Sequence, residues 1–128
     1  MSMTPPQLVA EAMAQIQQID IPATSTHLAS GGAVIDVREA GEYQAGHLPN
    51  AVNIPRGVLE FKIGDQATLA NKDLPIVLYC KTGGRAALAA VNLQRMGYQQ
   101  VRSLSGGFDG WVSGGQQVVT HPETTQFG

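Results

Sequence analysis

The decisive stretch of this sequence is Pro75-Ile76-Val77-Leu78-Tyr79-Cys80-Lys81-Thr82-Gly83-Gly84-Arg85. Its first part is apolar without interruption, which is typical of a buried strand in a parallel sheet. The residues after Cys80 are polar or glycine, so the strand is predicted to pass into a loop there. From Arg85 to Met96 the chain is rich in alanine and is predicted to form a helix that ends at Gly97. The stretch therefore encodes strand, loop and helix, with a thiol where the strand ends.

Short elements of the same kind are predicted on both sides of this unit. Strands are predicted at residues 19–21, 33–37, 51–54 and 101–104, and helices at 22–30, 39–45 and around 108–111. The segment 57–71 is predicted to be irregular, because Gly64 and Asp65 interrupt its alternating apolar residues. Strands that alternate with short helices indicate an α/β fold, with a parallel sheet covered on both faces. In such sheets ligands bind beyond the carboxyl ends of the strands, which is where Cys80 lies.

Three regions are predicted along the chain: an N-terminal helical extension (1–18), one domain (19–112) and a polar C-terminal tail (113–128). In the extension, apolar residues recur at helical spacing over about residues 4–18, after two prolines that suit a first helical turn: Leu8, Val9, Ala12, Met13 and Ile16. This apolar stripe is expected to pack on the domain, with a dimer contact as the alternative. Both a monomer and a homodimer are compatible with the sequence.

Composition narrows the classes of partner and compartment. The 128 residues are 43% hydrophobic and 14% charged, which fits one globular domain and not a disordered chain. The formal net charge of -2 provides no basic field for nucleic acid or for an anionic membrane. A single cysteine allows no internal disulfide, and the first residues carry no signal-peptide pattern. We therefore expect a soluble cytoplasmic protein.

The residues around Cys80 predict a reactive thiol. A cysteine beside an apolar strand is most often a small buried hydrophobe, but charged and flexible residues follow this one. Gly83 and Gly84 can turn successive backbone N–H groups inward, and the next helix presents its N-terminus to the same place. Lys81 and Arg85 add two cations. All of these features favour a thiolate, the form of cysteine that attacks.

A phosphatase-type cysteine loop is the main chemical alternative. Such loops characteristically place one more residue between cysteine and arginine than the four found here, which gives them enough amides to surround a phosphate. Tyr79 also stands where many such enzymes have histidine. The shorter loop favours a smaller target, such as a sulfane sulfur atom.

Three ordered blocks give the chain a family resemblance. They are Val34-Ile35-Asp36-Val37-Arg38-Glu39 with Glu42-Tyr43 and Gly46-His47-Leu48-Pro49-Asn50-Ala51-Val52-Asn53-Ile54-Pro55; then Cys80-Lys81-Thr82-Gly83-Gly84-Arg85-Ala86; then Leu104-Ser105-Gly106-Gly107-Phe108-Asp109-Gly110-Trp111. Over residues 19–112 the chain resembles a single-domain rhodanese, a sulfurtransferase. The resemblance implies an open, mostly parallel five-stranded sheet flanked by helices.

The resemblance also implies a ping-pong reaction. Cys80 would take a sulfur atom from thiosulfate or a related persulfide donor, hold it as a persulfide and pass it to a thiol or to cyanide. The donor would be a small anion bound by the loop, namely by Lys81, Thr82, Gly83, Gly84 and Arg85, with Arg85 also fixing the loop. No cofactor is implied, because the protein itself carries the sulfur.

Other polar residues are expected to have structural roles. Asp36 and Arg38 are interpreted as a hydrogen-bonded ion pair that orders nearby loops. His47 lies in a Gly-His-Leu-Pro turn and is expected to make a structural hydrogen bond, so a Cys-His hydrolase is excluded. No metal-ligand spacing is present. The remaining alternatives to a sulfurtransferase are a small phosphatase or arsenate reductase, and a non-catalytic sulfur-sensing or interaction module.

Overall fold

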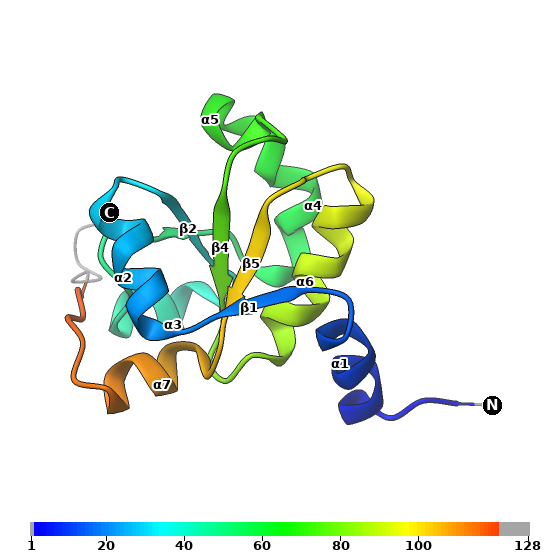
Figure 1. Ribbon diagram of the computed structural model, residues 1–128, viewed down its shortest axis with the longest axis horizontal. Coiled ribbons are helices and arrows are strands. Elements are labelled where there is room, and N and C mark those ends of the chain that lie inside the picture. The colour runs from blue at the N-terminus through cyan, green and yellow to red at the C-terminus, as the bar shows by residue number, and fades with distance from the viewer. Residues whose placement is uncertain (1, 121–128) are drawn as a thin grey trace.

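The computed structural model describes residues 2–120 and contains one open sheet with helices on both faces (Figure 1). All neighbouring strands are parallel and follow the order β1-β5-β4-β2-β3. The strands are β1 (Gln17–Ile19), β2 (Ala33–Asp36), β3 (Val52–Asn53), β4 (Ile76–Tyr79) and β5 (Val101–Leu104). The five-stranded α/β sheet expected from the sequence is therefore confirmed.

Strand β4 lies in the middle of the sheet and determines which way the reactive loop faces. Successive residues of a strand point to opposite faces. Leu78 and Cys80 join the core cluster on one face, whereas Tyr79 joins the cluster on the other. Every residue of β4 is fully buried, as the unbroken apolar run predicted.

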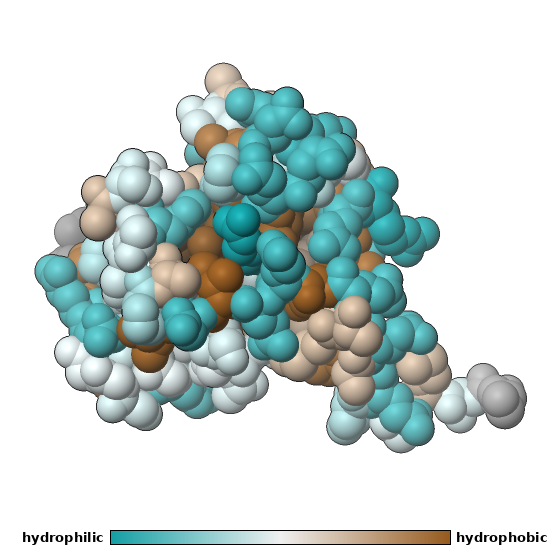
Figure 2. Space-filling model, viewed as in Figure 1, coloured by the Kyte–Doolittle hydropathy of each residue, from teal (hydrophilic) through white to brown (hydrophobic). Residues whose placement is uncertain are grey.

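The helices divide between the two faces of the sheet (Figure 1). One core cluster lies beneath α4 (Leu59–Lys62), α5 (Ala67–Ala70) and α6 (Gly84–Arg95), and the other beneath α2 (Ile21–Ala29), α3 (Ala40–Ala45) and α7 (Gly107–Ser113). On the face shown in Figure 2, hydrophilic residues cover much of the surface, and the most hydrophobic ones show mainly in the gaps between elements. No helix within residues 2–120 is long and apolar enough to cross a membrane.

The N-terminal extension is shorter than predicted and is partly built into the sheet. Helix α1 (Pro5–Met13) ends five residues before the predicted limit at residue 18, and Ile16 leaves the helix to pack against the core. Strand β1 then begins at Gln17, where a strand was expected only from residue 19, and it pairs with β5. Asp20 ends β1 earlier than predicted, because its carboxylate caps α2 by accepting a 2.9 Å hydrogen bond from the Ala23 N–H. The predicted boundary at 18/19 therefore cuts through β1.

Segment 57–71 is helical, so the prediction of irregular structure was wrong. It contains α4 and α5 together with two 3₁₀ turns, Arg56–Val58 and Ile63–Asp65. Leu59 and Ile63 are buried four residues apart, whereas Phe61 between them is 81% exposed. A spacing of four is helical, so the alternation of apolar residues was a misleading pattern here.

The beginning of the predicted tail folds back on the domain. The indole N–H of Trp111 donates a 2.7 Å hydrogen bond to the Gln117 carbonyl. Val119 and His47 exchange two backbone hydrogen bonds of 2.8 and 2.9 Å. Residues 121–128 of the predicted tail lie outside the described residues.

Candidate active site

Cys80 lies directly after β4, with its sulfur among backbone donors. The Gly83 N–H donates to Sγ at 3.1 Å and the Ala86 N–H donates at 3.4 Å. Gly83 has a φ of +133°, a conformation that favours glycine. Ala86 lies in the first turn of α6, where the N–H groups have no partner within the helix. The two donors and the helix dipole can hold negative charge on this sulfur.

The cationic side chains of the loop each pair with a carboxylate. Lys81 Nζ lies 2.8 Å from Asp109 Oδ2, in an exposed pair. Arg85 is held in a bidentate geometry, with Nη1 2.8 Å and Nη2 3.1 Å from the two oxygens of Glu42. The Arg85 hydrogen bond is the largest cause that lowers the pKa of Glu42, from 4.5 to about 2. Thr82, between the two cations, is exposed to solvent.

Helix α7 fixes the start of the loop from the other side. The Phe108 N–H donates to the Cys80 carbonyl at 2.8 Å, and the Asp109 N–H donates to the Lys81 carbonyl at 3.0 Å. This docking depends on Gly107, because a Cβ at that position would lie 2.6 Å from both carbonyl oxygens. Gly107, the first residue of α7, thus lets the start of that helix contact the loop backbone.

Asp36 and Arg38 form a buried ion pair beside this docking point. Arg38 Nη2 lies 2.7 Å from Asp36 Oδ2 and donates to the Gly46 carbonyl at 2.6 Å. The guanidinium carbon also lies 4.2 Å from the centroid of the Phe108 ring, in a cation–π arrangement. The pair therefore connects the ends of β2, α3 and α7, next to the loop.

Tyr79 belongs to the core cluster on the opposite face from Cys80, and His47 is buried against Tyr43, which packs on that cluster. The His47 ring is stacked 3.8 Å from that of Tyr43, and its Nδ1 lies 2.7 Å from the Leu48 carbonyl oxygen. The Leu48 N–H donates to the Tyr79 hydroxyl at 3.1 Å, and burial raises the pKa of Tyr79 far above its ordinary value. These residues make structural contacts around the Gly-His-Leu-Pro turn.

The model of the rhodanese-like domain matches residues 22–114, most of the chain. The chain belongs to the rhodanese-like domain family. The match leaves out α1 and β1, although β1 is part of the sheet of this rhodanese-like domain.

Named relatives support sulfur transfer as the general activity of this rhodanese-like domain. A sulfurtransferase of Allochromatium vinosum is 29% identical over 106 residues, which cover 81% of this chain and 95% of the relative. The thiosulfate sulfurtransferase GlpE of Pseudomonas savastanoi is 32% identical over 95 residues, covering 74% and 80%. A solved structure from Rhodopseudomonas palustris, described as a protein of unknown function and possible tyrosine phosphatase, aligns with a TM-score of 0.80 at 29% identity, covering 93% and 96%.

Helix α1 adds a feature that the family match does not include. It packs on α6, and its side chains reach the two glycines of the active-site loop. A Cβ placed on Gly83 would lie 3.3 Å from the Met13 Cε, and one placed on Gly84 would lie 3.3 Å from a Val9 methyl carbon. The N-terminal helix therefore supports the back of the rhodanese loop.

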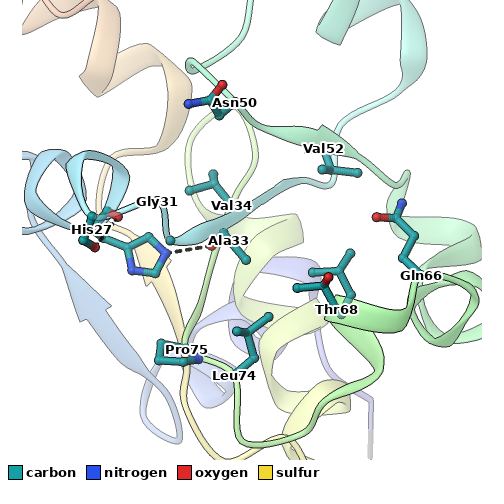
Figure 3. Close-up of a pocket in the computed structure, with 13 residues that line it drawn as sticks. His27, Gly31, Ala33, Val34, Asn50, Val52, Gln66, Thr68, Leu74 and Pro75 are labelled. Atoms are coloured by element: carbon teal, nitrogen blue, oxygen red, sulfur yellow. Dashed lines mark hydrogen bonds between the residues drawn. The ribbon is translucent and has the colours of Figure 1, made fainter.

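A cavity of about 570 Å³ lies at the other end of the sheet, and Cys80 is not among the residues that line it. Figure 3 shows this cavity. It opens beside the amino ends of β2 and β4, where His27, Val52 and Thr68 are among the residues around it. The His27 Nε2 lies 2.8 Å from the Ala33 carbonyl oxygen, which fixes the ring at the cavity wall. This cavity is not part of the Cys80 site.

Two residues of the site were missed in the sequence. Glu42 and Asp109 lie 43 and 28 residues from their cationic partners, beyond the range of any local pattern. Both lie inside the quoted family blocks, and neither has a cationic residue close to it in the sequence that would be its obvious partner. That isolation in the sequence is the only signal that could have singled them out.

Proposed function

We propose that this rhodanese-like domain transfers sulfane sulfur through a persulfide on Cys80. The observation that carries the proposal is the placement of Sγ at the end of the central strand, with the N–H groups of Gly83 and Ala86 directed at it. Such an oriented set of donors suits an anionic sulfur, whether thiolate or persulfide. The sulfurtransferase names of the relatives support the same chemistry.

The reaction proceeds in two displacements. The Cys80 thiolate attacks the outer sulfur of thiosulfate or of a persulfide donor; the Sγ–S bond forms, the donor's S–S bond breaks, and sulfite or a thiolate leaves with the electron pair. An acceptor thiolate or cyanide then attacks the outer sulfur and Cys80 leaves as a thiolate. No cofactor is needed, because the sulfur is carried on the protein.

The loop residues have separate roles in this scheme. The backbone from Lys81 to Arg85, with Thr82 and Gly84 between, forms the wall of the donor site, and Arg85 also holds the loop to Glu42. Cys80 is only 1% exposed, so donor binding must move the groups that cover the sulfur. Asp36 and Arg38 support the site without contacting the sulfur.

A cysteine-dependent phosphatase is the second candidate, since the similar structure from Rhodopseudomonas palustris is described as a possible tyrosine phosphatase. Two features argue against it. Only four residues separate Cys80 from Arg85, and the Arg85 guanidinium is already occupied by a carboxylate instead of standing ready for phosphate.

Intact mass measurement tests the proposal. Incubation with thiosulfate or with a persulfide donor should add one sulfur atom, and cyanide should remove it with release of thiocyanate. Cys80→Ser should gain nothing under the same conditions. Wild-type protein that gains no sulfur but hydrolyses p-nitrophenyl phosphate in a Cys80-dependent way would establish the phosphatase instead.

A further inference from the structure

The charges beside Cys80 cancel, although the loop sequence alone is cationic. The two loop cations, Lys81 and Arg85, face two carboxylates, Asp109 and Glu42, at ion-pair distances of 2.8 Å. The carboxylate of Glu39 also lies close enough to act on Arg85 electrostatically. Two further cations at this end of the sheet are also paired, Arg38 with Asp36 and Arg56 with Glu60. An arriving anion therefore meets ion pairs and no unpaired positive charge on the loop.

The structure holds both carboxylates in place. Glu42 binds Arg85 through both oxygens, and its Oε1 also accepts a 2.9 Å hydrogen bond from the Glu39 N–H at the start of α3. Asp109 is fixed by its backbone N–H, which binds the carbonyl of the same lysine that its carboxylate pairs with. A donor anion must therefore compete with both carboxylates for the cations of the loop.

We propose that Glu42 and Asp109 select the sulfur donor, favouring a persulfide of an uncharged thiol over dianionic thiosulfate. This inference rests on the proposed function of Cys80. A dianion must lose much of its hydration to reach a buried sulfur, and only a net positive site compensates for that loss. A neutral persulfide with an uncharged body adds no negative charge to the site when it reaches the Cys80 Sγ, to which Gly83 and Ala86 donate.

Sulfur transfer from such a donor to Cys80 needs no further reactant. The Cys80 thiolate attacks the outer sulfur of R–S–SH; the bond between Sγ and that sulfur forms, and the donor's S–S bond breaks. The leaving R–S⁻ takes the proton of the outer sulfur and departs as R–SH. The anionic persulfide that remains on Cys80 carries one negative charge, as the thiolate did, so the N–H donors serve both states.

Isosteric variants test this selection. Rates of persulfide formation are measured with thiosulfate, with the persulfide of 2-mercaptoethanol and with that of 3-mercaptopropionate, which adds one carboxylate. The wild type should react with 2-mercaptoethanol persulfide about fivefold or more faster than with the persulfide of 3-mercaptopropionate. Its reaction with thiosulfate should be the slowest of the three. Asp109→Asn and Glu42→Gln should each raise the ratio of the rate with thiosulfate to the rate with 2-mercaptoethanol persulfide by about fivefold at low salt. Added salt should reduce this increase in the rate ratio.

A matched control separates local from global charge. Asp73→Asn changes the net charge by the same amount at the amino end of β4, the opposite end of the sheet from Cys80, and should leave the donor ratio unchanged. Circular dichroism establishes that each variant is folded, and the exposed Asp109 provides a reading even if Glu42→Gln disturbs the loop.

The possible results are distinct. A wild type that forms the persulfide and prefers thiosulfate, with rates that fall as salt rises, overturns the selection by Glu42 and Asp109 but leaves the proposed function intact. Donor ratios that move equally in Asp109→Asn and Asp73→Asn also overturn it. Failure of Cys80 to take sulfur from any of the three donors overturns the proposed function, and the inference with it.

Discussion

Replacing Gly107 with alanine tests how closely α7 must approach the active-site loop. The added Cβ would lie 2.6 Å from the carbonyl oxygens of Cys80 and Lys81, whereas ordinary contacts begin at 3.4 Å. Helix and loop must therefore separate by about 0.8 Å. That movement weakens the two hydrogen bonds that Phe108 and Asp109 donate to the loop.

Gly106→Ala provides the matched comparison. Both glycines have positive φ, +81° at Gly106 and +59° at Gly107, so alanine costs about 1–2 kcal/mol of backbone strain at either position. At Gly106, however, the nearest atom to a new Cβ is 3.6 Å away. Only Gly107→Ala adds the loss of two hydrogen bonds, about 1–3 kcal/mol together, which brings its total to roughly 2–5 kcal/mol.

The assay combines urea unfolding with persulfide formation on folded protein. Gly107→Ala should unfold at lower urea than Gly106→Ala and should transfer sulfur about 100-fold more slowly, because a displacement near 1 Å at a reacting group has effects of that size. Equal unfolding midpoints and equal rates for the two variants would refute the argument that α7 positions the loop.

Three further changes have defined outcomes. Arg38→Met should lower the free energy of unfolding by about 3–5 kcal/mol, measured by urea titration, because it leaves the Asp36 carboxylate buried without its partner; a cost below 1 kcal/mol would contradict this role. Glu42→Gln should destabilise the protein near neutral pH and not near pH 2. The pKa of Glu42 is lowered from 4.5 to about 2, so its ion pair stabilises the fold fully above pH 4.5 and is lost as the pH falls through 2. An equal loss of stability at both pH values, measured by urea unfolding, would contradict this role of Glu42. Met13→Ala should cost about 1 kcal/mol and speed deuterium uptake at residues 83–86, since Met13 packs behind the loop; unchanged uptake would show that α1 does not support it.

The central strand and its loop could be predicted because their signals are local. The apolar run up to Tyr79 and the change to glycine and cations after Cys80 occupy consecutive residues, and both have a direct physical meaning. The same holds for the alternation of strands and helices that indicated a parallel sheet. For these elements, the reading from neighbouring residues agreed with the structure.

The parts that failed depend on contacts between distant residues. The end of α1 could not be placed, because Ile16 continues the helical spacing but leaves the helix to join the core. The apolar residues of segment 57–71 fit both an alternating pattern and a helical spacing of four. Only the burial of Leu59 and Ile63, with Phe61 exposed, shows that the helical spacing is the correct one. The partners of Lys81 and Arg85 were out of reach for the same reason, so the loop was expected to be more cationic than it is.

The single cysteine determines how this protein responds to oxidants. If Cys80 is oxidised to a sulfenic acid, no second thiol in the chain can resolve it as an internal disulfide. Recovery then depends on small thiols from outside, and further oxidation to a sulfinic acid is irreversible. Because Cys80 is only 1% exposed, both oxidation steps should be slow: peroxide must pass the same covering groups that a sulfur donor would have to move. If Cys80 carries sulfur as proposed, its burial protects it from oxidants and also slows the approach of the donor.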